Sequence, residues 1–218
     1  MLTPPKRQEV DHRTIKLIVG VVALSLAALT DLFAKTRIAS ISASYYEGGW
    51  SQSIFIGFLF AISALMLAYN GQSKREMVFS KVAAAAGFGV ALFPCACGVH
   101  TPPIPFVHSA SAAVMFLILA YFCYLFFRRA RSRSYSQAKL RSNIYVACGF
   151  AIVLSIVVIA LDRVSGGVIS GLLPRLVFYG EATALVAFGI SWLTASRVLP
   201  VITAEEERFS PLREVNPE

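Results

Sequence analysis

The chain has 218 residues, of which 56% are hydrophobic and 15% are charged, and its formal net charge is +8. Soluble domains carry about 25% charged residues, so this composition excludes an ordinary soluble protein. A net charge of +8 would suit a nucleic-acid-binding protein, but the positions of the cations, described below, exclude that class as well.

Six long apolar runs dominate the sequence, each near the roughly 20 residues that a helix needs to cross the hydrocarbon core. They lie at about 17–34, 51–70, 77–95, 105–127, 143–161 and 173–195. Backbone groups in lipid must be satisfied within the protein, and runs of this length favour helices over barrel strands. We therefore predict an all-α integral membrane bundle of six transmembrane helices over 15–197, with tails at 1–14 and 198–218. The C-terminal tail is mixed in charge and rich in turn-forming residues, so we expect it to be disordered.

Lysine and arginine are distributed unevenly between these runs. Sixteen of the 20 lie before the first run, between the second and third or at the start of the third, between the fourth and fifth, or after the sixth. An excess of cations marks cytoplasmic segments, so the sequence predicts that both termini are cytoplasmic. The first run also follows a basic segment, as in a secretory signal peptide. It is long for a signal peptide and "LFAKTR" is a poor cleavage site, so we expect an uncleaved helix.

The segment "SISASYYEGG" (40–49) follows the first run and lies on the predicted outer side. Ser40, Ser42 and Ser44 are suited to satisfy helix ends or to line a cavity. The two glycines after Glu47 allow a tight turn. We predict that this segment caps a polar pocket at the outer end of the bundle.

The positions of the four cysteines do not predict a disulfide framework. Cys123 and Cys148 fall inside predicted helices, where thiols behave as small apolar groups. Cys95 and Cys97 lie in "FPCACG" at the end of the third run. A bridge across one residue would be strained, and a C-x-C pair is weak evidence for a metal site. We interpret this segment as a helix end stopped by the neighbouring proline and glycine.

The ionisable residues near the predicted bilayer gather on the outer side. They are Asp31, His100, His108, Asp162, Arg175 and Glu181. Glu181 is about eight residues into the sixth run, or roughly 12 Å at 1.5 Å per residue. A carboxylate at that depth must pair, take up a proton or meet water, so Glu181 is the strongest candidate for a polar site.

Several stretches together resemble a widespread family of small bacterial multi-helix membrane proteins. They are "SISASYY", "IFIGFLFAISALMLAYNG", "HSASAAVMFLILAYFCYLFF", "RSNIYVACG" and "GEATALVAFGISWL", and the resemblance covers about 38–195. That family has no settled activity, so the resemblance implies an architecture and a location in the bacterial inner membrane. The matching polar positions are Ser40, Ser42, Tyr45, His108, Glu181 and Trp192.

A remoter similarity is to the alkaline ceramidases and adiponectin-type receptors. These are helical-bundle hydrolases that hold zinc, so the resemblance implies zinc-dependent hydrolysis of a lipid amide or ester. Here His100, His108 and Asp31 would bind the metal. Glu181 would act as general base, with Ser42 and Tyr45 stabilising the oxyanion. The chain departs from that pattern in having six apolar runs and two outer histidines.

Our leading interpretation is a membrane protein whose outer pocket binds a lipid or small amphiphile, or an accessory membrane subunit. The candidate ligand-binding residues are Ser40, Ser42, Tyr45, His108 and Glu181. The zinc-dependent hydrolase is the alternative, and a small transporter is the third class. We find no inverted repeat and no interrupted run, which are the signatures of many transporters. We predict membrane lipids as partners and leave open a homo-oligomer or a membrane-protein partner.

Overall fold

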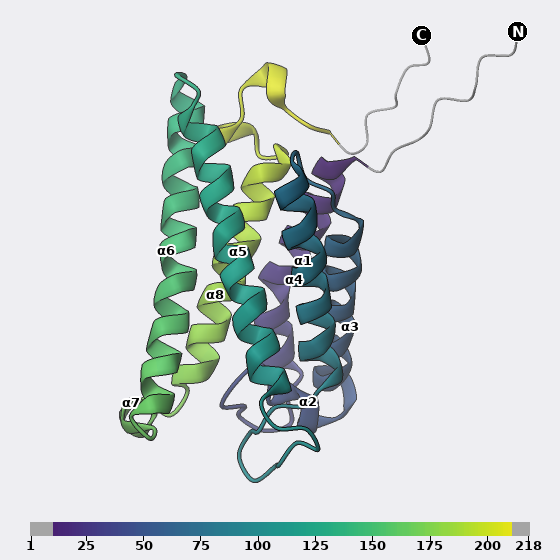
Figure 1. The fold of residues 1–218 in the computed structure, drawn as a ribbon, viewed down its shortest axis with the longest axis vertical. Coiled ribbons are helices and arrows are strands. Elements are labelled where there is room, and N and C mark those ends of the chain that lie inside the picture. Colours follow the sequence, from purple (N-terminus) through teal and green to yellow (C-terminus); the bar gives the residue numbers. More distant parts are fainter. Residues whose placement is uncertain (1–10, 211–218) are drawn as a thin grey trace, which may run out of the picture.

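The computed structural model describes residues 11–210, and over that range it is built from helices without strands. The long helices are α1 (His12–Leu32), α3 (Gly49–Ala68), α4 (Lys74–Leu92), α5 (Val107–Arg131), α6 (Ser136–Val164) and α8 (Leu176–Ser196). They run side by side along the long axis of the molecule (Figure 1). The short helices α2 (Ser44–Glu47) and α7 (Val168–Leu172) lie at one end of this bundle. We call this the loop end. The opposite, terminal end carries the start of α1 and the 3-10 turns η1 (Pro200–Ile202) and η2 (Glu205–Glu207).

Five of the long helices have the length and apolar composition needed to cross a membrane. The prediction of an all-α, multi-pass membrane protein is therefore confirmed. The exception is α4, which has 19 residues but carries four charged residues among its first eight, Lys74, Arg75, Glu76 and Lys81. The remainder of α4 is apolar and rich in alanine.

The six long helices coincide with the six predicted runs, and their ends differ for physical reasons. Helical hydrogen bonds continue past the apolar part of a span, so α5 extends to Arg131 and α6 begins at Ser136. The third helix ends earlier than predicted, at Leu92. The next residue, Phe93, is extended (φ −105°, ψ 120°), because the residue before a proline avoids the helical region.

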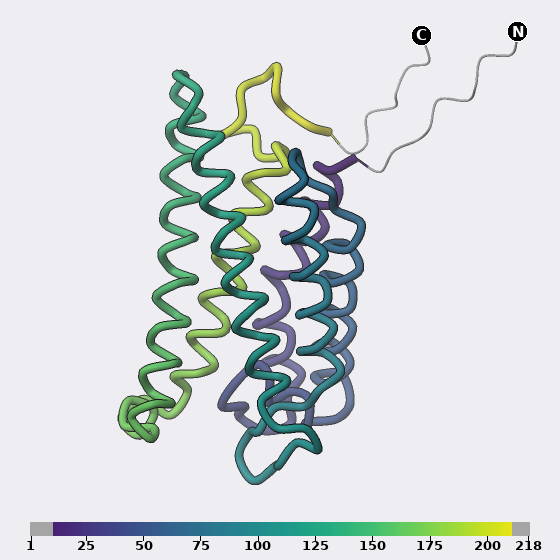
Figure 2. Tube along the Cα trace, in the orientation of Figure 1, coloured from purple at the N-terminus to yellow at the C-terminus, as the bar shows by residue number. Residues whose placement is uncertain are grey.

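The long helices form a closed ring in the order α1, α3, α4, α5, α6 and α8, with α8 returning to α1. The trace in Figure 2 shows the first and last long helices side by side. Small residues permit this contact, as they commonly do between membrane helices. A Cβ placed on Gly189 of α8 would lie 2.9 Å from the carbonyl oxygen of Gly20 in α1. The aromatic rings of Trp192 and Phe188 are fully buried in the core beside this contact.

The described part of the C-terminal tail is ordered against the bundle, so the expectation of disorder is wrong there. Glu207 pairs with Arg133, with Arg141 at 3.0 Å and with Arg197 at 2.9 Å. The tail therefore has a tertiary partner that its own composition does not show. Residues 1–10 and 211–218 of the predicted tails lie outside the described residues.

Candidate functional site at the loop end

Glu181 holds the segment that follows α1 against α8. Its Oε2 accepts the backbone N–H of Ile41 at 2.6 Å and that of Ser42 at 3.2 Å, and its Oε1 accepts the Ser42 hydroxyl at 2.8 Å. The two donor residues are buried, with 2% and 7% of their surfaces exposed. Glu181 itself is half-buried, because part of it faces the pocket described below. The predicted deep carboxylate thus meets the predicted serine-rich loop.

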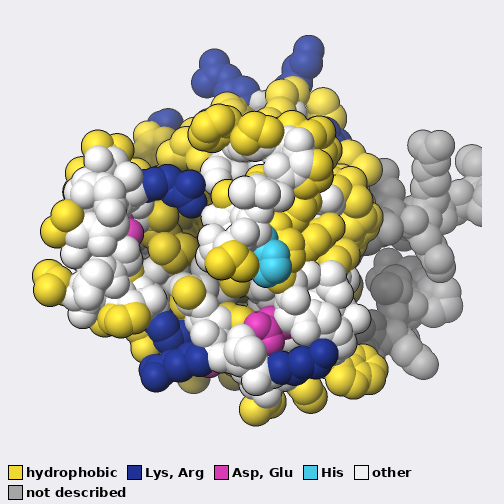
Figure 3. Space-filling view, turned by 90° about the horizontal axis from the view of Figure 1, so that it is seen from below, with side chains coloured by type: hydrophobic (Ala, Val, Ile, Leu, Met, Phe, Trp, Pro, Cys, Tyr) yellow, Lys and Arg dark blue, Asp and Glu magenta, His cyan; other side chains and the backbone are white. Residues whose placement is uncertain are grey.

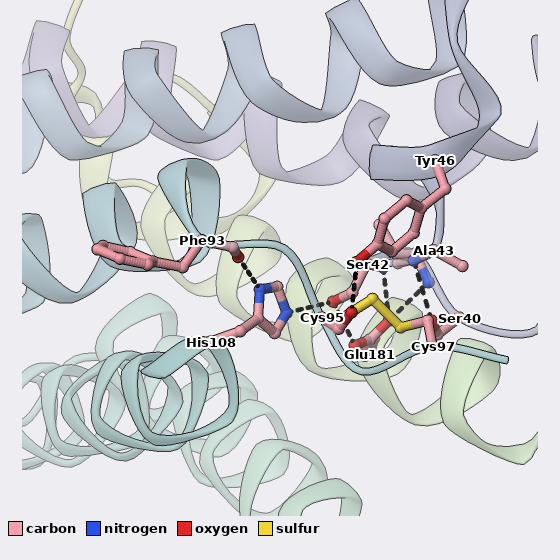
Figure 4. The surroundings of a disulfide bond; sticks show 10 residues. Ser40, Ser42, Ala43, Tyr46, Phe93, Cys95, Cys97, His108 and Glu181 are labelled. Carbon is pink, nitrogen blue, oxygen red and sulfur yellow. Dashed lines mark hydrogen bonds between the residues drawn. A yellow bond between two sulfur atoms is a disulfide. The ribbon is translucent and has the colours of Figure 1, made fainter. Parts of the chain in front are cut away.

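His108 extends this hydrogen-bonded cluster from the first turn of α5. Its Nε2 lies 3.0 Å from Ser42 Oγ, and its Nδ1 lies 2.8 Å from the carbonyl oxygen of Phe93. Figure 4 shows the imidazole between Phe93 and Ser42, with Glu181 beyond the serine. His108 is buried, with 6% of its surface exposed. The early end of α4 at Leu92 is what leaves the Phe93 carbonyl facing the ring.

The three side chains can make all of these hydrogen bonds only if the cluster holds one proton more than a carboxylate, a hydroxyl and a neutral imidazole together carry. The Phe93 carbonyl only accepts, so His108 Nδ1 must carry a proton. Ser42 has a single hydroxyl proton but lies within hydrogen-bonding distance of both His108 Nε2 and Glu181 Oε1. Both contacts are hydrogen bonds only if either Glu181 or His108 is protonated. The cluster is then a neutral acid with a neutral imidazole, or a carboxylate with an imidazolium, related by proton transfer through Ser42.

A disulfide between Cys95 and Cys97 lies beside this cluster, which corrects the prediction that these cysteines do not bridge. The prediction placed Cys95 at the end of a helix, whereas the chain has already left the helix there. Their Cα atoms are 5.3 Å apart, within the range that a disulfide spans. Ser40 Oγ lies 3.7 Å from Cys97 Sγ, and the disulfide contacts the segment that Glu181 holds (Figure 4).

Thiol labelling checks this correction. We expect alkylation of the denatured, unreduced protein to modify two cysteines, since Cys123 and Cys148 are free and Cys95 and Cys97 are bonded. Reduction before alkylation should raise the number to four. Intact-mass spectrometry counts the labels. Four labels without reduction would show that the disulfide is not formed.

A pocket of about 220 Å³ joins the cluster to an apolar wall. Its polar lining includes Ser40, Ser42, His108, Glu181 and both bonded cysteines. The apolar wall comes from three helices and includes Ala112, Ala113 and Phe116 of α5, Ile156, Ile159 and Ala160 of α6, and Val177 of α8. Figure 3 shows the loop end, where hydrophobic side chains surround a hollow and lysine and arginine side chains lie around it.

Arg163, which sequence reasoning passed over, also lines this pocket from the end of α6. Its side chain makes none of the ion pairs or hydrogen bonds found among residues 11–210. The neighbouring Asp162 is buried and accepts the backbone N–H of Ser170 at 2.8 Å, so it serves the α7 connection. Arg163 is one of the four cations in the predicted outer loops. That scarcity was the signal that could have identified it.

The three residues predicted to bind a metal do not come together. Asp31 pairs with Arg175, which also donates to the carbonyl oxygen of Ile38 at 2.9 Å. The ring of His100 stacks on that of Tyr46, with the ring centroids 3.9 Å apart. His108 binds Ser42 and Phe93 instead. Within residues 11–210, no three His, Cys, Asp or Glu side chains form a group that could hold a metal ion.

Two other residues of the predicted loop, Tyr45 and Ser44, support the loop and do not line the pocket. Tyr45 is outside the pocket lining, and its carbonyl oxygen accepts the side-chain amide of Gln52 at 2.6 Å. Ser44 is fully buried at the start of α2. The turn predicted after Glu47 is present, since Gly48 and Gly49 have φ values of 68° and 58°. These residues shape the loop, and the pocket is lined by Ser40 and Ser42 alone among the loop residues.

Glu47 closes the loop and makes its stability depend on pH. The Thr36 hydroxyl donates to Glu47, and this is the main reason that the pKa of this carboxyl lies below its usual value. The N–H groups of Thr36 and Lys35 act in the same direction. A carboxyl with a lowered folded-state pKa stabilises the fold fully above its unfolded-state pKa, and this contribution is lost as the pH falls through the folded-state pKa.

We therefore expect wild type to melt above Glu47→Gln near neutral pH and the two curves to converge in acid. Thermal unfolding in detergent, followed at pH values on both sides of the usual carboxyl range, measures this difference. A difference in melting temperature that stays constant across the range would contradict the proposed role of the Glu47 carboxylate.

Comparisons of the chain with protein-family models, with curated proteins and with solved structures find no match.

Proposed function

We propose that the chain is a six-helix protein of the bacterial inner membrane with both termini in the cytoplasm. In this orientation the charged start of α4 lies at the cytoplasmic headgroups, and its apolar remainder crosses the membrane. The cation-rich segments then all lie on the cytoplasmic side, as the positive-inside rule requires. The loop end, with its pocket, lies at the outer leaflet.

We further propose that the pocket binds an amphiphile with an anionic headgroup. The observation that carries this proposal is the union of a polar end and an apolar wall in one pocket. Ser42, His108 and Glu181 form the polar end, and Arg163, whose side chain makes no ion pair in the described part of the chain, adds a positive charge. The alanine- and isoleucine-rich wall between α5, α6 and α8 suits an acyl chain.

Photocrosslinking tests this proposal. The purified protein in detergent would be irradiated with a diazirine-bearing fatty acid or with a neutral diazirine-bearing monoacylglycerol. We expect the fatty acid to label peptides of α5 and α6 that line the pocket, saturably. Ala113→Trp should fill the pocket and reduce labelling by both probes at least tenfold. Arg163→Gln should reduce labelling by the fatty acid more than labelling by the neutral probe.

Ala147→Trp is the matched control. Ala147 lies in a separate groove between α6 and α8 that does not include the polar cluster. This substitution adds the same ring to the bundle surface and should leave labelling of the pocket unchanged. Equal labelling of wild type and Ala113→Trp would overturn the proposal.

A second candidate function is acyl transfer by Ser42, and one observation favours it. His108 Nε2 lies 3.0 Å from Ser42 Oγ while the Phe93 carbonyl fixes the other ring nitrogen, as in a nucleophile and base held by a third group. This arrangement needs no metal ligand set. A fluorophosphonate probe should then modify wild type once and leave Ser42→Ala unmodified. If the folded wild-type protein stays unmodified, acyl transfer by Ser42 is contradicted.

A further inference from the structure

We propose a second binding site, at the terminal end of the bundle, for a phosphate monoester. A cavity of about 220 Å³ opens there, on the opposite end of the molecule from the amphiphile pocket. Five cations line it, from α1, α5, the connection between α5 and α6, and the segment after α8: Arg13, Lys16, Arg129, Arg133 and Arg197. Two carboxylates line it, Asp11 and Glu207. The lining is mostly polar, so the site suits a charged group and not an acyl chain.

Lys16 is the central observation. It is buried, with 8% of its surface exposed, although it carries an ammonium group and lies in the second turn of α1. Its Nζ lies 5.5 Å from the ring centroid of Tyr69 and 5.4 Å from that of Phe126. Lys16 belongs to none of the ion pairs found within residues 11–210. Buried ammonium groups are ordinarily paired, so an anion in the cavity would supply the partner.

The cavity already binds one oxyanion of its own. The Glu207 carboxylate, from turn η2, accepts hydrogen bonds from Arg141 at 3.0 Å and Arg197 at 2.9 Å, and pairs with Arg133. Guanidinium groups match carboxylate and phosphate oxygens through paired N–H donors. Glu207 thus shows that these arginines are arranged around an oxyanion, and it would compete with a ligand for them.

Charge and size select the ligand class. Asp11 and Glu207, together with Glu76, which pairs with Arg129, still leave an excess of cations around the cavity. A phosphate monoester would bring close to two negative charges and three acceptor oxygens. A single water needs roughly 10–15 Å³ of such space, so a cavity of about 220 Å³ admits a phosphoryl group with part of its carrier. The carrier is either a lipid, as in a phosphomonoester headgroup, or a soluble molecule.

Binding measurements on the full chain test the site with two probes. Glycerol 3-phosphate titrated into detergent-solubilised protein, followed by calorimetry, is the soluble arm. Native mass spectrometry of protein reconstituted in nanodiscs of phosphatidylcholine with one-fifth phosphatidic acid is the lipid arm. We expect saturable binding in at least one arm, and the arm that responds identifies the source of the phosphate.

Three variants make the test specific to the cavity. Lys16→Met keeps the length of the side chain and should weaken binding at least tenfold. Glu207→Gln removes the competing charge and should tighten binding severalfold, a gain that misfolding would not produce. Lys139→Met removes an exposed cation outside the cavity and should change nothing. Absence of binding in both arms, or equal weakening by Lys16→Met and Lys139→Met, would overturn the proposal.

Discussion

Replacing Glu181 with alanine is expected to be among the most destabilising single changes in this chain. The substitution leaves two buried donors without an acceptor, the N–H groups of Ile41 and Ser42, while the Ser42 hydroxyl can still donate to His108. Each buried donor left unsatisfied costs about 1–3 kcal/mol, so we expect a loss of about 2 kcal/mol or more. The loop before α2 should also detach from α8. Thermal unfolding in detergent measures the first effect, and tryptic cleavage after the exposed Arg37 measures the second.

Two further variants separate hydrogen bonding from charge in this prediction. Glu181→Gln keeps one accepting oxygen but cannot exchange a proton with His108 through Ser42. We expect it to lie between wild type and Glu181→Ala in stability. Thr183→Ala changes an exposed residue of the same helix and should behave as wild type. A Glu181→Ala protein as stable as the Thr183→Ala control would show that the loop is held by other contacts.

Placing a methyl group on Gly189 is expected to disrupt the contact between α1 and α8. A Cβ at this position would lie 2.7 Å from Leu24 Cγ, 2.9 Å from Gly20 O and 3.0 Å from Leu24 N. Two of these atoms belong to the backbone of α1, which cannot turn away as a side chain can. Overpacking of this kind costs about 1–3 kcal/mol, so Gly189→Ala should lower the unfolding temperature clearly.

Gly57→Ala is the matched control for this second prediction. Gly57 lies in α3, and a Cβ placed there would meet no atom within 4 Å. Alanine is favoured over glycine inside a helix by about 0.8–1.0 kcal/mol, so this variant should be neutral or slightly stabilised. Equal behaviour of the two variants would show that α1 and α8 are not packed backbone to backbone.

The architecture and the centre of the candidate site were accessible from the sequence, because both depend on hydropathy. Apolar runs of about 20 residues specify helices in lipid, and the six runs match the six long helices. A carboxylate deep in a span must find a partner, which singled out Glu181. The serine-rich loop was predicted at the same end, where Ser42 now lies 2.8 Å from Glu181.

The rest of the site depends on pairings that no local pattern shows. The disulfide was missed because the predicted helix extended to Cys95. The helix α4 instead ends three residues earlier, at Leu92, so both cysteines lie outside it and can approach each other. The metal-binding residues were predicted from their type and from their position on one side of the membrane. The structure shows that Asp31 instead forms an ion pair with Arg175. The partners of Glu207 are at least ten residues away along the chain. No local pattern shows them, so the C-terminal tail was predicted to be disordered from its composition alone.

The long separation between Ile41 and Glu181, 140 positions along the chain, has a consequence for how the protein is made. The ribosome finishes α1 and the following loop well before it reaches α8. Until that last helix enters the membrane, the loop lacks its acceptor and the ring of helices stays open between α1 and α6. In an unfinished or truncated chain this loop therefore lacks the contact with α8 that the complete fold gives it.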